Sequence, residues 1–239
     1  MQEQPPSEDD TASTKKRAVA AGPESGRNPG AGWRPVAARL LDHPGFAPEL
    51  LALAAVDTLG PVAEGWVART RGAYPDADAD GLARLATRRF VRRAGTGGAV
   101  AAGAGVLAPV AELAAVLWTQ ASLVLHLAAV YDRDPGHPDR VAELLLLTRV
   151  HPDLGSSRVA VEAVPSAGVP VGGPRPRAAE AAWRLTMPLA AQAGGWLRLR
   201  LASRLLPGVA VLAAAAGGSA AAERLAARAV AFYRPPRPR

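Results

Sequence analysis

Cysteine is absent from the 239 residues of this chain, and lysine occurs only as Lys15 and Lys16. Without cysteine there is no disulfide, no thiolate metal site, no iron–sulfur cluster and no cysteine nucleophile. Without a lysine in its glycine-rich stretches, the chain cannot form a Walker-type phosphate loop. Aromatic residues make up 5% of the chain, so the core has to be built mainly from aliphatic side chains and alanine.

Strand-like alternation of apolar and polar residues is also missing, which argues against a sheet. Much of the 49% apolar fraction is alanine, the strongest helix former but one that buries little apolar area. The composition therefore predicts an all-α fold, a closely packed helical bundle with Ala/Gly-rich apolar segments. The first 32 residues are polar and lack the apolar core of a secretory signal, which predicts a disordered tail and a cytoplasmic protein.

A recurring order of features predicts two related, hairpin-like helical halves. Arg84–Tyr131 and Arg198–Tyr233 each run from an arginine-bearing helix through an uncharged Gly/Ala-rich segment and a glutamate to a helix ending in an aromatic residue. A helix break is expected at the sequence DHPGF, and a kink or break at Pro61. A turn at Pro75 with an acidic helix start, at Asp76, Asp78 and Asp80, is expected before the arginine-bearing helix. The expected divisions are a tail (1–32), an N-terminal half (33–150) with an apolar hairpin (94–131), a Pro/Gly-rich loop (151–177), a C-terminal half (178–234) and a second tail (235–239).

The net charge of +7 comes almost entirely from arginine. A basic protein can bind phosphate, on nucleic acid or on lipid, but a GC-rich genome also raises arginine usage without selection for function. One helix concentrates the charge, because five arginines span about half of its circumference at 100° per residue. These are Arg84, Arg88, Arg89, Arg92 and Arg93, with Ala83, Ala86, Phe90, Val91 and Ala94 on the opposite half.

A basic amphipathic helix that leads into an apolar segment is typical of proteins at the surface of an anionic membrane. The alternative is an ordinary solvated basic face. Nucleic acid is not expected as a partner, because single-strand binding surfaces interleave aromatic side chains with basic ones, and only Phe90 is near, on the apolar side.

The next segment, RRAGTGGAVAAGAGVLAPVAEL from Arg92 to Leu113, allows three interpretations. Gly103, Gly105 and Ala108 fit a loose dinucleotide-binding pattern, but an arginine-rich helix precedes them where that motif needs a strand. A hairpin that dips into lipid is the second interpretation, since small residues allow close helix contacts there. The third is a pair of close-packed helices in a soluble bundle, and the sequence leaves the second and third open.

These residues resemble the central motif of the EcsC family of bacterial proteins. RRAGTGGAVAAGAGVLAPVAELAAVLWTQASLVLHLAAVYDRD carries its Gly-rich apolar segment, acidic residue and helix ending in tyrosine, and RLLPGVAVLAAAAGGSAAAERLAARAVAFYR is similar to its C-terminal segment. The sequence departs from the motif at Asp132, where glycine is usual, at Glu112, where aspartate is usual, and at Ser219, where asparagine is common. The resemblance implies a helical, membrane-associated protein of unsettled role, and it supplies no catalytic residues.

Polar residues within the apolar segment are the remaining candidates for function. Glu112, Thr119 and His126 recur every seven residues on one helix face and are expected to be buried. Three of the four histidines precede proline, which turn chemistry explains more simply than metal binding. The sequence has no nucleophile motif, no metal-ligand spacing and no cofactor motif. We therefore expect no catalytic residues, no metal and no cofactor.

The expected function is therefore that of a non-enzymatic, EcsC-like protein associated with the inner face of the cell membrane. A soluble helical interaction module is the first alternative, and an unrecognised hydrolase is the second.

Overall fold

The computed structural model describes residues 33–96, 108–166, 174–192 and 207–236. Every regular element in these residues is a helix, so the prediction of an all-α bundle is confirmed. The contacts divide the chain into Met1–Pro35 and Val36–Arg239. Of the first unit only residues 33–35, which begin helix α2, are described, and the buried core of the described residues lies in the second unit.

Prolines mark the limits of the first helices. Helix α2 (Trp33–Asp42) ends at the DHPGF sequence, which forms the short 3-10 helix η1 (Pro44–Phe46). Helix α3 (Ala47–Ala73) has a proline in its first turn, where the missing N–H would have no partner within the helix anyway. Helix α3 does not break at Pro61, where a kink or break was expected, but continues through that residue for 27 residues in all.

Helix α4 (Ala79–Thr96) begins as its acidic start predicts. The Asp78 Oδ1 atom accepts a hydrogen bond from the backbone N–H of Gly81 at 2.7 Å, and Asp80 lies in the first turn. Helix α5 (Ala108–Val130) ends in a left-handed turn at Asp132, whose φ is 58°. Arg71 closes this end, since its guanidinium donates to the Val130 carbonyl at 2.9 Å and pairs with Asp132 at 2.8 Å.

The prediction of a loop over residues 151–177 is wrong for most of the described part. Helix α6 (Asp139–Leu147) is followed by helix α7 (Leu154–Ala163), the 3-10 helix η4 (Val164–Ser166) and helix α8 (Pro174–Gln192). The carboxylate of Asp153 caps α7 by accepting from the backbone N–H of Ser156 at 2.8 Å. The Pro, Gly and Ser content of this segment predicted a loop, although Asp153 is a favourable N-cap residue for a helix.

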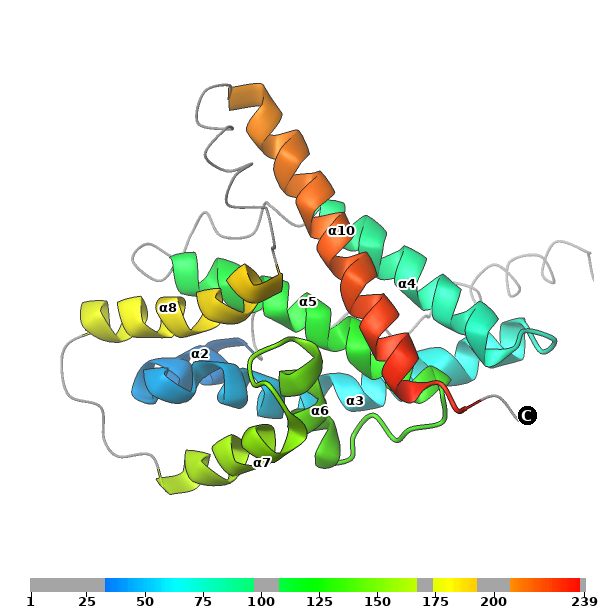
Figure 1. The fold of residues 1–239 in the computed structure, drawn as a ribbon, viewed down its shortest axis with the longest axis horizontal. Coiled ribbons are helices and arrows are strands. Elements are labelled where there is room, and N and C mark those ends of the chain that lie inside the picture. The colour runs from blue at the N-terminus through cyan, green and yellow to red at the C-terminus, as the bar shows by residue number, and fades with distance from the viewer. Residues whose placement is uncertain (1–32, 97–107, 167–173, 193–206, 237–239) are drawn as a thin grey trace, which may run out of the picture. The chain divides into compact units, whose positions relative to one another are not determined.

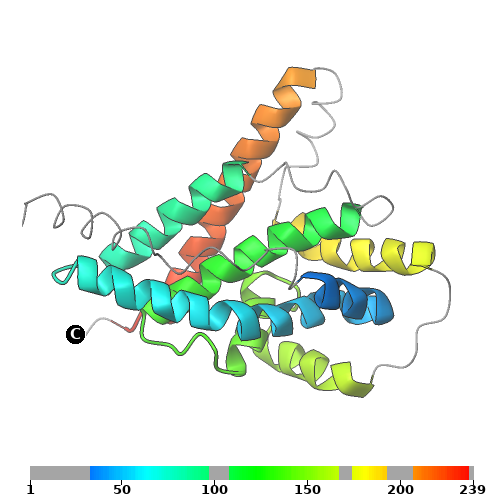
Figure 2. The same cartoon turned by 180° about the vertical axis from the view of Figure 1, so that it is seen from behind.

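Helix α5 is the centre of the core. It packs against α3, α4, α8 and the last helix, α10 (Pro207–Tyr233), while α10 also lies alongside α4 (Figure 1; Figure 2). Every side chain from residue 123 to residue 131 is buried. The end of the expected apolar hairpin is thus surrounded by protein within the described structure, whereas Val116, earlier in α5, is exposed.

Several predictions fall on residues outside those described. They are the disordered tail (1–32), most of the Gly/Ala-rich segment (97–107), part of the expected loop (167–173), the start of the C-terminal half (193–206) and the last residues of the second tail (237–239). The division into two related halves stays a prediction.

Candidate functional site

Three of the five arginines predicted to share a face of α4 are exposed along it. Arg84, Arg88 and Arg92 follow one another at intervals of four residues, so about 40° separates neighbours around the helix. None of the ion pairs among the described residues involves them. We call these three residues the arginine row.

The other two arginines do not extend the row. The guanidinium of Arg89 lies over the ring of Trp66 on α3, with 5.8 Å between the guanidinium carbon and the ring centroid. This cation–π contact places Arg89 on the packed edge of the helix, half-buried. The side chain of Arg93 lies outside the described residues. Ala83, Ala86 and Phe90, predicted for the apolar half, are all buried in the core.

Two residues of the arginine row, Arg84 and Arg88, border an open groove of about 440 Å³ between α4 and α10. Its floor is apolar and is made of small side chains from both helices, while charged side chains stand at its edges. On α10 the groove residues recur at positions i, i+3, i+4 and i+7, which puts them on one helix face, and Arg234 follows directly after the helix. The lining residues are Asp80, Ala83, Arg84, Thr87, Arg88, Tyr131, Glu223, Ala226, Ala227, Val230 and Arg234.

A hydrogen-bonded clasp joins three parts of the chain at one end of the groove. The Tyr131 hydroxyl donates to Asp80 Oδ1 at 2.7 Å, and Arg234 Nε donates to the same oxygen at 3.0 Å. Arg234 Nη2 lies 2.8 Å from the other oxygen of Asp80, so the guanidinium holds the carboxylate with two nitrogens. The clasp therefore joins three places in the chain: the start of α4, the turn after α5 and the end of α10.

The clasp also fixes the protonation of its members. The hydrogen bond from Tyr131, together with Arg234, holds the pKa of Asp80 below its usual value despite partial desolvation. Burial, followed by the hydrogen bond to Asp80, raises the pKa of Tyr131. At neutral pH Asp80 is a carboxylate and Tyr131 a neutral donor, so the negative charge of Asp80 is balanced by Arg234 within the clasp.

The three polar candidates of α5 do not form a site together. The side chain of Glu112 lies outside the described residues, and the Thr119 hydroxyl donates to the Ala115 carbonyl of its own helix at 2.9 Å. His126 is buried, with its ring centroid 5.3 Å from that of Trp66 and 4.9 Å from that of Phe90. Its Nδ1–H donates to the Ser122 carbonyl at 2.7 Å, so His126 acts as a core residue.

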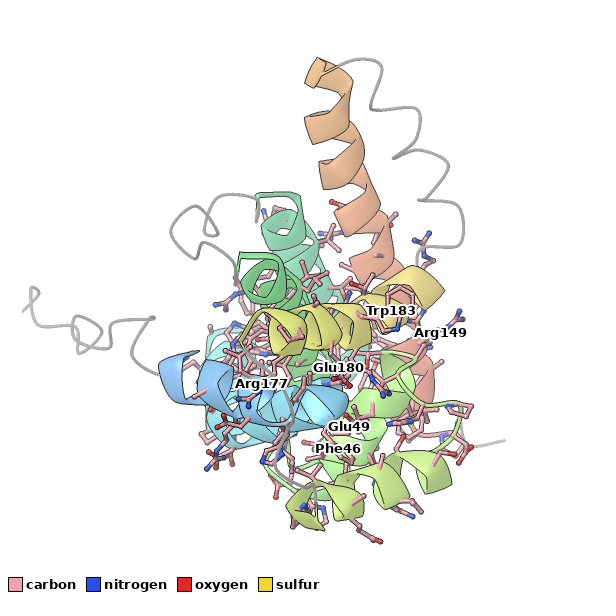
Figure 3. All side chains as sticks on the ribbon, turned by 90° about the vertical axis from the view of Figure 1, so that its left-hand side faces the viewer. Phe46, Glu49, Arg149, Arg177, Glu180 and Trp183 are labelled. Atoms are coloured by element: carbon pink, nitrogen blue, oxygen red, sulfur yellow. The ribbon has the colours of Figure 1, made fainter. Side chains whose placement is uncertain are left out.

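A second polar cluster lies where α8 crosses η1 and the start of α3 (Figure 3). Its centre is the buried Glu49, whose Oε1 atom lies 2.8 Å from His151 Nε2, and whose Oε2 atom has no hydrogen-bond partner in the described structure. Glu180 of α8 approaches the same place, near Gly45 of η1. No group of three metal-ligating side chains occurs in the described part of the chain. Sequence reasoning missed the Glu49–His151 contact because 102 residues separate its members.

Within the residues that the structure describes, two helical segments are long and apolar enough to cross a membrane by length and composition, at Pro44–Ala73 and Leu113–Val130. Half of the most apolar stretch in the first segment, and two thirds of that in the second, are buried within the protein. Core helices of soluble proteins meet the same criterion, so these two helices are weak evidence for a membrane span.

Comparison with known proteins adds no relative. No protein-family model matches the chain, and neither a curated protein nor a solved structure matches it.

Proposed function

We propose that the protein is a non-enzymatic, EcsC-like helical protein that binds the anionic inner surface of the cell membrane. The observation that carries this proposal is the arginine row, which is exposed on one helix face without an ion pair among the described residues. Each guanidinium near an anionic surface contributes roughly 1 kcal/mol, so three of them contribute about 3 kcal/mol at low salt. Because α5 is buried in the protein from residue 123 to its end, contact through the row is peripheral and needs no exposed apolar helix.

One feature of the backbone supports the EcsC resemblance at a position where the sequence departs from it. Asp132 occupies the left-handed turn after α5 with a φ of 58°. Glycine, which is usual there in the EcsC motif, adopts this conformation without steric cost, and aspartate is among the residues that tolerate it. The departure at Asp132 is therefore compatible with the turn that a glycine would make.

A soluble helical interaction module is the second candidate function. It is favoured by the partial burial of both apolar helices, since an apolar stretch that is packed inside its own fold needs no lipid to cover it. The two functions differ in whether purified protein binds vesicles.

Vesicle flotation tests the proposed function. The wild type is expected to float at low salt with vesicles that contain phosphatidylglycerol, and high salt should release it. It should not bind vesicles of phosphatidylcholine alone. The triple variant Arg84→Gln, Arg88→Gln, Arg92→Gln should bind the anionic vesicles about a hundredfold less tightly, the equivalent of roughly 3 kcal/mol.

A charge-matched control separates the row from net charge. Arg69, Arg133 and Arg158 are exposed elsewhere on the protein, and changing all three to glutamine removes the same total charge. This control should weaken vesicle binding far less than the row variant. Failure of the wild type to float with anionic vesicles at low salt would refute the proposal. If the protein instead gave a salt-sensitive gel shift with DNA or RNA, nucleic acid would be the favoured partner.

A further inference from the structure

The groove beside the arginine row has the chemistry of a binding site for one lipid molecule. We propose that it binds a single anionic phospholipid, with the phosphate against Arg84 and Arg88 and the glycerol and first acyl carbons over the apolar floor. The inference rests on the proposed function and deepens it, because it adds a stoichiometric site to a charged surface.

The floor determines that the ligand is amphipathic. Ala83 of α4 and Ala226, Ala227 and Val230 of α10 offer no side-chain hydrogen-bond donor or acceptor, so a wholly polar ligand would lose hydration there without compensation. Small side chains leave the space open, and its volume of about 440 Å³ lies within the roughly 300–1,000 Å³ of small-molecule sites.

The edges determine the sign of the charge that binds. Five charged residues line the groove, two of them acidic and three basic. Asp80 is balanced by Arg234 within the clasp, which leaves Arg84 and Arg88 against Glu223 on the opposite helix. The remaining charge is positive, and guanidinium groups bind phosphate oxygens with two parallel N–H donors. Glu223 opposes an anion, so its charge limits the affinity.

The lining also favours a lipid over a nucleotide. Tyr131 is the one aromatic residue among the described lining residues, and its hydroxyl is held by Asp80. A nucleotide base would find no free aromatic face to stack on, whereas acyl carbons find an alanine floor beside the same arginines. Acyl chains can leave through the open side of the groove toward the membrane that the arginine row contacts.

A short-chain lipid tests the site without a membrane. Dihexanoyl phosphatidylglycerol, titrated below its critical micelle concentration into the full-length protein in a calorimeter, should bind saturably at one molecule per chain. Dihexanoyl phosphatidylcholine and inorganic phosphate should each bind at least about tenfold more weakly, because the first lacks net charge and the second cannot use the floor.

Charge variants define which residues hold the ligand. Arg84→Gln and Arg88→Gln should each weaken binding of the short-chain lipid by about tenfold, and Glu223→Gln should strengthen it severalfold. Arg92→Gln is the matched control, since Arg92 belongs to the row but does not line the groove. It should weaken vesicle flotation and leave binding of the short-chain lipid unchanged. A gain of affinity in Glu223→Gln cannot arise from misfolding.

A steric variant tests the floor without a change of charge. Ala227 is exposed on the floor of the groove, so Ala227→Trp should fill the groove, abolish binding of the short-chain lipid and leave the helical circular dichroism spectrum intact. Ala68→Trp, on an exposed position of α3 away from the groove, is the control and should bind normally.

The outcomes separate this inference from the proposed function. If the wild type floats with anionic vesicles but does not bind the short-chain lipid, the groove proposal is overturned and surface binding stands. If it binds the short-chain lipid but does not float, the proposed membrane function is overturned and the lipid site stands. Equal affinity for inorganic phosphate and the short-chain lipid overturns the assignment to lipid, as does tight binding by Ala227→Trp.

Discussion

Two glycines of helix α3 provide a test of the packing, because the same substitution should act in opposite directions at the two positions. A β-carbon at Gly60 would lie 2.9 Å from Gly136 Cα, 3.0 Å from the Pro135 carbonyl oxygen and 3.1 Å from Gly136 N. A β-carbon at Gly72 would meet nothing within 4 Å. Gly60→Ala is therefore expected to destabilise the protein, and Gly72→Ala to stabilise it.

The magnitudes follow from two opposing terms. Alanine gains about 1 kcal/mol over glycine within a helix, and this gain applies to both variants, somewhat less at Gly72 near the helix end. Overpacking costs typically 1–3 kcal/mol, and it applies at Gly60 alone. The clash there is with backbone atoms, which cannot rotate away as the end of a side chain could. The turn is also held in place, because Gly136 N donates to Asp134 Oδ1 at 2.8 Å.

The difference in unfolding free energy between the two variants isolates the contact, since the helix-propensity gain largely cancels. It should amount to about 1–3 kcal/mol, with Gly60→Ala the less stable, or roughly 2–12 °C in Tm for a chain of this length. Urea and thermal unfolding followed by circular dichroism measure it. Equal stability of the two variants would show that the 135–136 turn does not press against α3, and the described packing of α3 would be wrong.

The remaining predictions concern two helix ends. Arg149, just after α6, has a φ of 60°, a left-handed conformation in which glycine is usual at a helix end. Arg149→Gly should therefore raise the free energy of unfolding in urea by about 1 kcal/mol, and a lower free energy of unfolding would show that the arginine backbone is not strained there. Asp153→Ala should destabilise α7 at neutral pH. The hydrogen bonds from Ser156 lower the pKa of Asp153, so this cap stabilises the fold fully above the usual pKa of 3.8 and loses its effect as the pH falls through the lower folded value. The stability difference between wild type and Asp153→Ala should therefore shrink below about pH 4 and be absent in strong acid, and a difference independent of pH would contradict a role for the carboxylate.

Local signals in the sequence were sufficient for the fold class and for several helix limits. Alanine content and missing strand alternation predicted an all-α protein, and the acidic start predicted where α4 begins. The same type of signal was present at Asp153, followed three residues later by Ser156, but a composition averaged over residues 151–177 concealed it. A helix cap depends on one side chain at one position, whereas Pro and Gly content describes a whole window.

The candidate site was only partly predictable, because periodicity places residues on a face without saying what covers that face. Arg84, Arg88 and Arg92 could be placed on one side of α4 from their spacing alone. The packing of Arg89 against Trp66 depends on α3, and the clasp joins Asp80 to partners 51 and 154 residues away. A single sequence holds no signal for such pairings, so neither the clasp nor the groove could be found before the structure.

The structure also bears on whether the arginine excess has a function or reflects genome composition. Several arginines have roles within the fold: Arg71 closes the end of α5, Arg228 donates to the Leu147 carbonyl at the end of α6, and Arg234 holds Asp80. Composition bias alone would distribute the remaining arginines without regard to their surroundings. Arg84, Arg88 and Arg92 instead share one exposed face, and two of them border an apolar groove in which Arg234 balances Asp80 and only Glu223 opposes them. That combination of fixed internal pairs and a cationic edge left to solvent is what an anionic, amphipathic ligand requires.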